Sequence, residues 1–170
     1  AGNLASASDA VAIQGAGSGG EPQGIIGSTG VGTISAGSMN YDKTLEFQGS
    51  LAQSSAILNA AAVAYVTTPS VALDCKKRLK FTGADTPLWT GSIHRGEIDG
   101  HTAVSTLNCP SATMICGDWS QLAIGQWGTL LIEVDPFTKF KYGLIGVRGM
   151  LSVDVMLLNP KSFFVMQNAT

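Results

Sequence analysis

The sequence predicts an α+β domain, in which a few helices flank a mixed sheet and a long hairpin extends from it. Three observations support this class. Apolar residues recur at helical spacing in the first half of the chain, short apolar runs of strand length stand between Pro and Gly residues, and a long extended segment lies near the C-terminus. With 170 residues, the chain is long enough for one domain with a sizeable core, or for one domain plus an extension.

Four segments carry helix signals. Residues 4–13 and 41–53 have apolar residues at helical spacing. A third helix is predicted over residues 69–79, because it begins with Pro69 and proline is favoured at the first helical position. A short fourth helix is predicted over residues 119–125. These helices alternate irregularly with strands, which is typical of the α+β class.

Strands are predicted where short runs of β-branched and aromatic residues are bounded by turn residues. A Gly/Ser-rich connector over residues 15–38 has a short strand-like core of its own. Two long runs would form a hairpin around a loop at residues 136–142. The predicted strands cover residues 61–66, 114–116, 129–134, 144–158 and 162–166, and an extended segment over residues 96–106 contains the turn signal Asp99–Gly100.

Charged residues are scarce in this chain. They make up 13% of it, against roughly 25% in typical soluble domains, whereas the apolar share of 45% is ordinary. A chain with a normal core and few charges is expected to bury much of its exterior against neighbouring subunits. The alternative is a monomer covered by Ser, Thr, Asn and Gly, which the 21 glycines leave open. The net charge of −2 gives no basic field that would attract nucleic acid or an anionic membrane.

Cysteine usage and hydropathy exclude several other classes. Three cysteines without CxxC spacing argue against a disulfide framework and a zinc knuckle, and indicate free thiols in a reducing compartment. The longest charge-free run, residues 47–73, contains Gln, Asn and Pro and is not a membrane span. The N-terminal stretch AGNLASASDA lacks the basic head and apolar centre of a signal peptide.

Two short motifs suggest ligands but have weak contexts. Residues 15–20 satisfy the GxGxxG pattern, yet a predicted helix precedes them and Glu21–Pro22 follows, so the strand–turn–helix setting of a dinucleotide site is missing. The run KKRLK, residues 76–80, holds four of the ten basic residues. It is either a nucleic-acid patch, a subunit contact, or a set of cations that interact favourably with a helix C-terminus.

The stretch HRGEIDGH offers the side chains of His94, Glu97, Asp99 and His101. In a strand, Glu97, Asp99 and His101 would share one face, and metals take such ligands, so a small metal-dependent enzyme is one hypothesis. The alternative is an exposed polar strand edge, because a turn at Asp99 would interrupt the strand where the cluster needs it intact. No GxSxG motif occurs, and neither histidine has an activated Cys or Ser nearby. No catalytic, metal or cofactor site is therefore assigned.

The stretches GDWSQLAIGQWGTLLIEVDPFT and SVDVMLLNPKSFFVM resemble the C-terminal half of the major capsid proteins of tailed bacteriophages, which have the Hong Kong 97-type fold. Upstream, DAVAIQGAGSGGEPQGIIGSTGV and AYVTTPSVALDCKKRLK also resemble segments of that family, so the similarity spans nearly the whole chain. The motifs that match in order are Gly117-Asp118-Trp119, Ile124-Gly125-Gln126-Trp127-Gly128, Asp135-Pro136, Asp154-Val155 and Pro160-Lys161-Ser162-Phe163.

This resemblance implies a division into four regions. Residues 1–40 would hold the end of a spine helix and the Gly/Ser-rich connector, a remnant of the peripheral domain. Residues 41–127 would form the axial domain, a mixed central sheet flanked by helices, to which residues 158–170 return as a strand. Residues 128–157 would be the long β-hairpin of the peripheral domain. The family's N-terminal arm and extended loop have no counterpart, so the chain is expected to be the C-terminal portion of such a protein.

The resemblance also implies a structural function rather than an enzymatic one. The chain would be a coat subunit of a tailed phage or prophage that self-assembles into the icosahedral head enclosing DNA. Its partners would be copies of itself in pentamers and hexamers, scaffolding or protease proteins during assembly, and packaged DNA without sequence-specific contact; neither a cofactor nor a membrane is expected. The chain would reside in the virion, and in the bacterial cytoplasm during assembly. The nearest alternative is an encapsulin-like compartment shell, which shares the fold but encloses enzymes.

Two assembly surfaces and a structural core follow from the same resemblance. The axial loop, with Pro87, Leu88 and Trp89, would be exposed in a single chain and covered by neighbours at a five- or six-fold axis. Trp119 and Trp127 are expected in the core. The hairpin tip would meet other capsomers near a three-fold axis, although its aromatic rings have the alternative of tucking against the hairpin itself. The tip residues are Asp135, Phe137, Lys139, Phe140, Lys141 and Tyr142.

Overall fold

The computed structural model describes the backbone of residues 2–169 and the side chains of residues 6–139 and 141–169. The chain divides into two compact units. Residues 124–154 form the smaller one, the hairpin unit, and the rest of the described chain forms the larger one, the sheet unit. The boundaries predicted for the axial and peripheral regions rest on the family resemblance, and this division stays a prediction.

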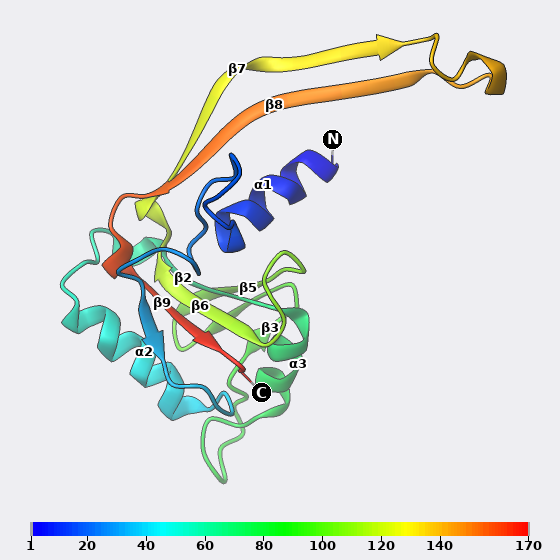
Figure 1. Ribbon diagram of the computed structural model, residues 1–170. Helices are drawn as coiled ribbons and strands as arrows, with labels where there is room; N and C mark the ends of the chain where they lie inside the picture. The colour runs from blue at the N-terminus through cyan, green and yellow to red at the C-terminus, as the bar shows by residue number, and fades with distance from the viewer. Residues whose placement is uncertain (1, 170) are drawn as a thin grey trace. The chain divides into compact units, whose positions relative to one another are not determined.

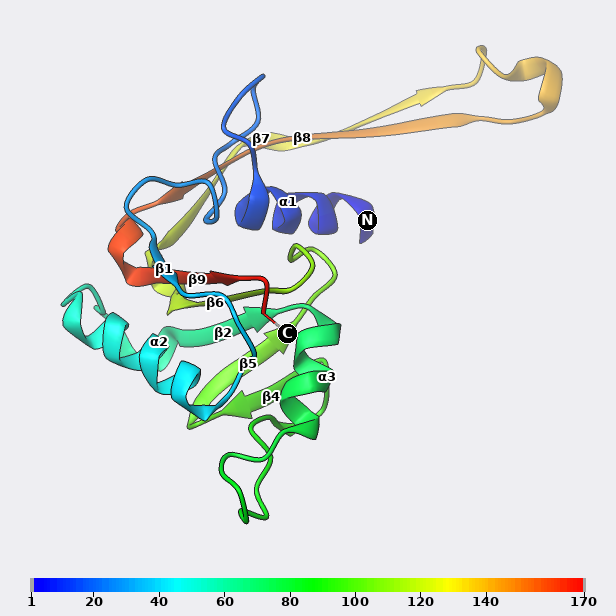
Figure 2. The ribbon, with the colours of Figure 1, turned by 60° about the horizontal axis from the view of Figure 1, so that its bottom comes forward.

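The sheet unit is built on one seven-stranded mixed sheet (Figures 1 and 2). Its strands are β1 (Gly32–Ile34), β2 (Val63–Thr67), β3 (Thr90–Gly91), β4 (Arg95–Ile98), β5 (His101–Ser105), β6 (Thr113–Asp118) and β9 (Phe163–Gln167). They lie in the order β1-β9-β6-β2-β5-β4-β3. The pairs β1–β9 and β2–β5 are parallel, and the other neighbours are antiparallel. The predicted α+β class with a mixed sheet is confirmed.

Two helices cover one face of this sheet. These are α2 (Tyr41–Gln53), over the predicted residues, and α3 (Pro69–Lys77). The side chain of Asn40 caps α2 by accepting a hydrogen bond from the Lys43 N–H at 2.9 Å. Apolar side chains of both helices enter the main core between them and the sheet. Its members include Phe47, Leu51, Val71, Ala72, Cys75, Tyr65, Met114, Cys116 and Met166.

The opposite face of the sheet carries a second, smaller core. The end of α1 (Gly2–Gln14) supplies Ile13, and the connector that follows it supplies Ile25. On the sheet, Ile115 and Val165 belong to this cluster, whereas their chain neighbours Met114 and Met166 belong to the main core. This alternation is the two-residue period of a strand that is buried on both faces.

The helix predicted over residues 119–125 is wrong in most of its length. Only the 3₁₀ turn η2 (Trp119–Gln121) forms, and the strand β7 (Leu122–Asp135) begins directly after it. Gly125 and Gly128 lower the helix propensity of this segment, and pairing with β8 (Gly146–Leu157) supplies hydrogen-bond partners to its backbone instead.

The hairpin unit is a two-stranded sheet, drawn as a long ribbon in Figure 1. It consists of the outer part of β7, the tip with the 3₁₀ turn η3 (Phe140–Tyr142), and the outer part of β8. Gly128 interrupts β7 with a φ of 71°, a left-handed conformation that glycine adopts without strain. An ion pair between Glu133 and Arg148 joins the two strands, with Arg148 Nε 3.1 Å from the carboxylate. The predicted hairpin and its loop after Asp135 are confirmed.

Candidate assembly surfaces

The strands of the hairpin unit expose a contiguous apolar surface. In the run after Thr129, the exposed fractions are 48% for Leu130, 49% for Leu131, 61% for Ile132 and 62% for Val134. Successive side chains of a strand point to opposite faces, so both faces of this ribbon carry apolar groups. Among the described side chains of residues 124–154, none is buried. An apolar run of this kind is typical of strands covered on both sides, and here the unit itself covers neither.

Trp127 belongs to this exposed surface, and its assignment to the core is wrong. Its side chain is 61% exposed. A two-stranded ribbon has no second layer against which an indole could be buried, so only contact with something outside the unit would cover it.

The hairpin tip is organised by Asp135. Its carboxylate accepts hydrogen bonds from the backbone N–H groups of Phe137, at 2.9 Å, and Thr138, at 3.2 Å, and from the Thr138 hydroxyl. These bonds, the Thr138 hydroxyl first, hold the pKa of Asp135 below its usual range. The acid at the tip therefore shapes the turn, and Lys139 and Lys141 add two positive charges to the tip.

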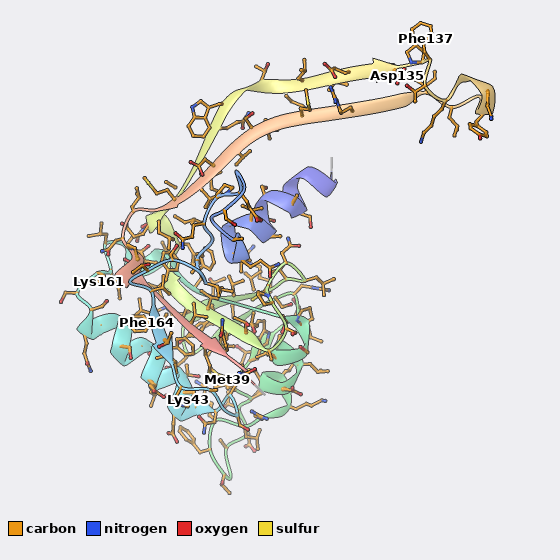
Figure 3. All side chains as sticks on the ribbon, in the orientation of Figure 1. Met39, Lys43, Asp135, Phe137, Lys161 and Phe164 are labelled. Atoms are coloured by element: carbon orange, nitrogen blue, oxygen red, sulfur yellow. The ribbon has the colours of Figure 1, made fainter. Side chains whose placement is uncertain are left out.

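The tip presents its aromatic rings to solvent. Phe137 is 83% exposed and points away from the hairpin in Figure 3, so it does not tuck against the strands. Tyr142 is 69% exposed, with Lys141 Nζ 5.1 Å from its ring centre, and Lys139 is exposed as well. The side chain of Phe140 lies outside the described residues. The tip thus combines exposed rings with cations, the composition that protein interfaces favour.

The exposure predicted for the axial loop is wrong for two of its three residues. Leu88 is 1% exposed and Trp89 is fully buried in the main core, and Pro87 is half-buried. The indole N–H of Trp89 donates to the Ser92 carbonyl at 2.7 Å, and the ring packs so closely on Gly96 that a side chain there would collide with it. Residues 81–86 are the exposed part of this loop, and Phe81 at its start is 58% exposed.

Antiparallel backbone pairing holds the base of this exposed loop. The N–H of Leu88 donates to the Arg78 carbonyl at 2.8 Å, and that of Lys80 to the Thr86 carbonyl at 3.1 Å. Since residues 78–80 are extended in this pairing, α3 ends at Lys77 and not at residue 79 as predicted.

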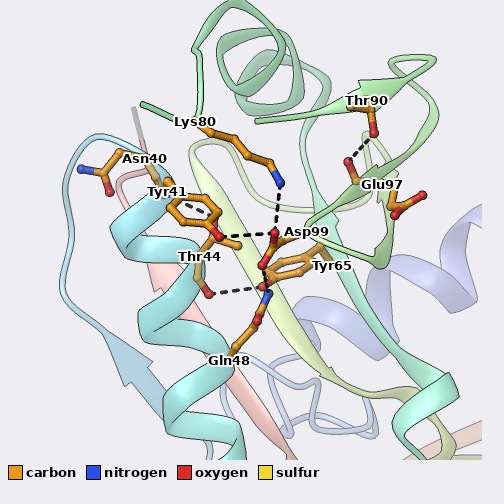
Figure 4. A network of polar contacts seen from close by, with 9 residues as sticks. All are labelled: Asn40, Tyr41, Thr44, Gln48, Tyr65, Lys80, Thr90, Glu97 and Asp99. Carbon is orange, nitrogen blue, oxygen red and sulfur yellow. Dashed lines mark hydrogen bonds and ion pairs between the residues drawn. The ribbon is translucent and has the colours of Figure 1, made fainter. Parts of the chain in front are cut away.

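The basic run before the loop is used for internal contacts. Lys76 donates to the Gly91 carbonyl at 2.5 Å, and Arg78 donates to the Met39 carbonyl at 2.7 Å. Lys80 forms a 3.0 Å ion pair with Asp99 (Figure 4). These three cations contact three different parts of the chain, namely β3, the segment before α2 and the β4–β5 turn, so they do not form a free patch for nucleic acid.

Asp99 is the centre of the polar network drawn in Figure 4. Besides Lys80, its carboxylate accepts from Gln48 at 3.3 Å and from the Tyr41 hydroxyl at 3.5 Å. These contacts, that of Lys80 first, hold its pKa below the usual range. Asp99 and Gly100 have φ values of 49° and 85° and connect β4 to β5 as a two-residue hairpin turn, which confirms the predicted turn signal.

The four residues of the metal hypothesis are not brought together. Asp99 is committed to the network just described, and His94 and Glu97 are exposed. The His101 ring lies 6.3 Å from that of Tyr65. No group of three or more His, Cys, Asp or Glu suited to a metal occurs among the described residues. The turn at Asp99 is the physical reason, because it breaks the strand that would have aligned the ligands.

Comparison with known proteins decides the family. The model of the phage capsid family matches residues 1–168. The chain belongs to the phage capsid family. It is 25% identical to the major capsid protein of Halomonas phage phiHAP-1 over 154 residues. The matched residues make up 90% of this chain and 25% of that protein.

Solved capsid structures share the fold of this family member. The capsid of a native GTA particle matches with a TM-score of 0.72 and 16% identity, over 99% of this chain and 63% of that one. Gordonia phage Cozz matches with a TM-score of 0.70 and 17% identity, over 99% of this chain and 61% of that one. The chain thus spans about a quarter of the curated relative and under two thirds of these solved chains. Among the described residues of this capsid-family chain, no helix is long and apolar enough to cross a membrane.

A buried carboxylate, that of Asp118 in the Gly117-Asp118-Trp119 motif, fixes the start of the hairpin. Asp118, at the end of β6, is fully buried and accepts hydrogen bonds from the N–H groups of Leu58 (3.0 Å) and Asn59 (2.9 Å) and from Ser120 N–H and Oγ. It therefore joins the loop after α2 to the point where the chain leaves the sheet for β7. The Asp-Trp-Ser sequence was the available signal, because an aspartate that accepts from the N–H two residues later is a recurrent turn motif.

Trp119, beside this carboxylate, is half-buried and packs against the smaller core. Its indole N–H donates to the Ala64 carbonyl at 3.0 Å, and its ring meets that of Phe163 edge-on, with centres 5.6 Å apart. Trp119 contributes to the structural core as expected, where Trp127 does not.

Proposed function

We propose that this capsid-family chain is part of the major capsid protein of a tailed phage or prophage, the coat subunit that self-assembles into an icosahedral head around DNA. The observation that carries the proposal is the apolar hairpin, both faces of which the hairpin unit itself leaves uncovered. Membership of the phage capsid family and the similarity to a phage major capsid protein support it, and favour a phage head over a compartment shell that encloses enzymes.

In this proposal the two units have different tasks. The sheet unit, with its exposed loop at residues 81–86, acts as the axial domain around which pentamers and hexamers form. The hairpin unit belongs to the peripheral domain, where its tip meets other capsomers near a three-fold axis. The exposed rings of Phe137 and Tyr142 supply the area that contact buries, and Lys139 and Lys141 favour one register through charge.

The proposal extends to partners and location. Copies of the same chain are the main partner, scaffolding or protease proteins take part in assembly, and DNA is enclosed without sequence-specific contact, as the low net charge of −2 suits. The mature protein resides in the virion. Its role is structural, without catalysis or cofactor.

Expression of the full-length protein by itself, followed by electron microscopy and sedimentation, tests the proposal. The wild type should form shells, whereas replacement of Phe137, Lys139, Phe140 and Lys141 together by Ser should leave soluble, folded protein that closes no shells. Leu107→Ser is the matched control, because Leu107 is 87% exposed but lies outside the hairpin, and it should assemble normally. Normal shells from the fourfold variant would remove the tip from the assembly mechanism, and a wild type that stays monomeric would refute the function.

A further inference from the structure

Two helices of the sheet unit each leave a leucine in solvent on their outer side. Leu45 of α2 is 44% exposed and Leu73 of α3 is 40% exposed, although both helices bury other apolar residues against the sheet. Each leucine lies in the middle of a stripe with helical spacing. On α2 the stripe runs Asp42, Leu45, Gly49, and on α3 it runs Ser70, Leu73, Lys77.

The two stripes complement each other in reverse order. From N- to C-terminus, the α2 stripe is acidic, apolar and small, whereas the α3 stripe is small, apolar and basic. An antiparallel pairing would therefore set Asp42 against Lys77, Leu45 against Leu73, and Gly49 against Ser70. In this pairing each three-residue step of one stripe lies beside a four-residue step of the other. A helix rises 1.5 Å per residue, so the paired positions are displaced along the helix axes by only ~1.5 Å.

The charges at the ends of the stripes are available for such a contact. Asp42 makes no ion pair among the described residues. Lys77 makes a long ion pair, 4.0 Å, with Asp74 on its own helix, and its side chain stays 67% exposed. Glu46, beside the α2 stripe, is neutralised by Lys43 at 2.6 Å. A side chain added at Gly49 would meet nothing within 4 Å, so the surface there is open to close approach.

The two stripes of one chain do not meet each other. Figures 1 and 2 show α2 and α3 apart on the sheet, with the loop at residues 81–86 extending between them. The complement of each stripe is therefore the other stripe of a second copy.

We propose that α3 of a second copy packs antiparallel on α2, with the three pairs named above as its centre. The contact joins two different surfaces, so it is heterologous, and its repetition about an axis closes a ring with the exposed 81–86 loops converging inside it. The inference rests on the proposed capsid function and adds to it the surface through which neighbours in one ring recognise each other.

Charge reversal in the full-length protein tests the contact. Asp42→Lys and Lys77→Asp, each alone, should lower the yield of rings or shells by at least about tenfold, because like charges then face each other at every contact of the ring. The two changes combined should restore assembly. Glu21→Lys, at an exposed acid of the connector, is the matched control and should assemble as the wild type does. Single variants that assemble normally, or a combined variant that does not recover, would overturn the contact.

A cysteine pair gives an independent readout that does not depend on how the charge variants fold. Leu45→Cys with Leu73→Cys should yield a ladder of disulfide-linked oligomers on oxidation, and neither change alone should yield any. The natural cysteines Cys75, Cys109 and Cys116 are buried and do not compete. Dimers from Leu45→Cys alone would show a two-fold contact between α2 helices and overturn the heterologous one. Shells without crosslinks would refute this contact alone, whereas a wild type that forms no oligomer would refute the proposed function with it.

Discussion

The sheet unit and the hairpin unit draw on the same kinds of residue and use them in opposite ways. In the sheet unit, strands rich in apolar residues are covered by α2 and α3 on one face and by the end of α1 and the connector on the other. In the hairpin unit, the run from Leu130 to Val134 is apolar except for Glu133, but the unit has no second layer of its own, and the apolar side chains of the run are 48–62% exposed. Apolar sequence therefore marks surface to be covered, and does not say which molecule covers it.

The same difference in burial between the two units is seen at two single residues, Trp89 and Trp127. Trp89 was expected in solvent and is fully buried, and Trp127 was expected in the core and is 61% exposed. Trp89 follows a loop that folds back along Arg78, and its ring lies in the main core. Trp127 lies on a two-stranded ribbon that has no second layer of its own. The immediate neighbours do not predict this difference, since Trp89 stands between Leu88 and Thr90 and Trp127 between Gln126 and Gly128. What packs on each ring makes the difference.

Trp89→Ala should have the largest effect on this comparison. Emptying a fully buried aromatic site costs about 3–5 kcal/mol, so the free energy of unfolding should fall by that amount. Chemical denaturation of the chain measures it. A loss below about 1 kcal/mol would place Trp89 at the surface and restore the original view of the axial loop.

Asp118→Ala should have the next largest effect, about 2–3 kcal/mol, because it removes the charged acceptor of the backbone N–H groups of Leu58 and Asn59 in the loop after α2. Burial raises the pKa of Asp118, but its hydrogen bonds from Ser120, Asn59 and Leu58 lower it by more, so the folded pKa lies below the ordinary 3.8. The stabilisation by this carboxylate is therefore complete above pH 3.8 and is lost as the pH falls through the folded pKa.

Denaturation curves of Asp118→Asn between neutral pH and pH 3 measure that dependence. The variant should be less stable than the wild type near neutrality and should lose less stability on acidification, so that the two curves approach each other. Parallel curves would mean that another carboxylate carries the acid sensitivity of the sheet unit.

Trp127→Ala should have the smallest effect on the stability of the single chain, within about 0.5 kcal/mol, because an exposed side chain leaves little contact behind. In the full-length protein the same change should reduce shell yield, since the ring would then be covered by a neighbour. Thermal unfolding and sedimentation report the two quantities separately. A large destabilisation of the free chain would show that the hairpin unit buries this ring by itself.

Local signals determined many of the elements. Asn40 and the apolar spacing after it fixed α2, Pro69 fixed the start of α3, and Asp99–Gly100 fixed the β4–β5 turn, because caps, proline and left-handed turn residues act through their own backbone and nearest neighbours. The short motifs that resemble those of phage major capsid proteins also pointed to the phage capsid family, which the comparison with known proteins established.

The sequence by itself determined these elements, their α+β class and the capsid family. Only the tertiary structure decided which tryptophan is buried, that Asp118 is a buried anchor, and that Lys76, Arg78 and Lys80 are tied to three separate elements. The partners in these cases lie far along the chain, as with Asp118 and Leu58 or Lys80 and Asp99. Burial and charge pairing depend on what the folded chain brings against a residue, and that arrangement is set by packing across the whole sheet rather than by neighbours in sequence.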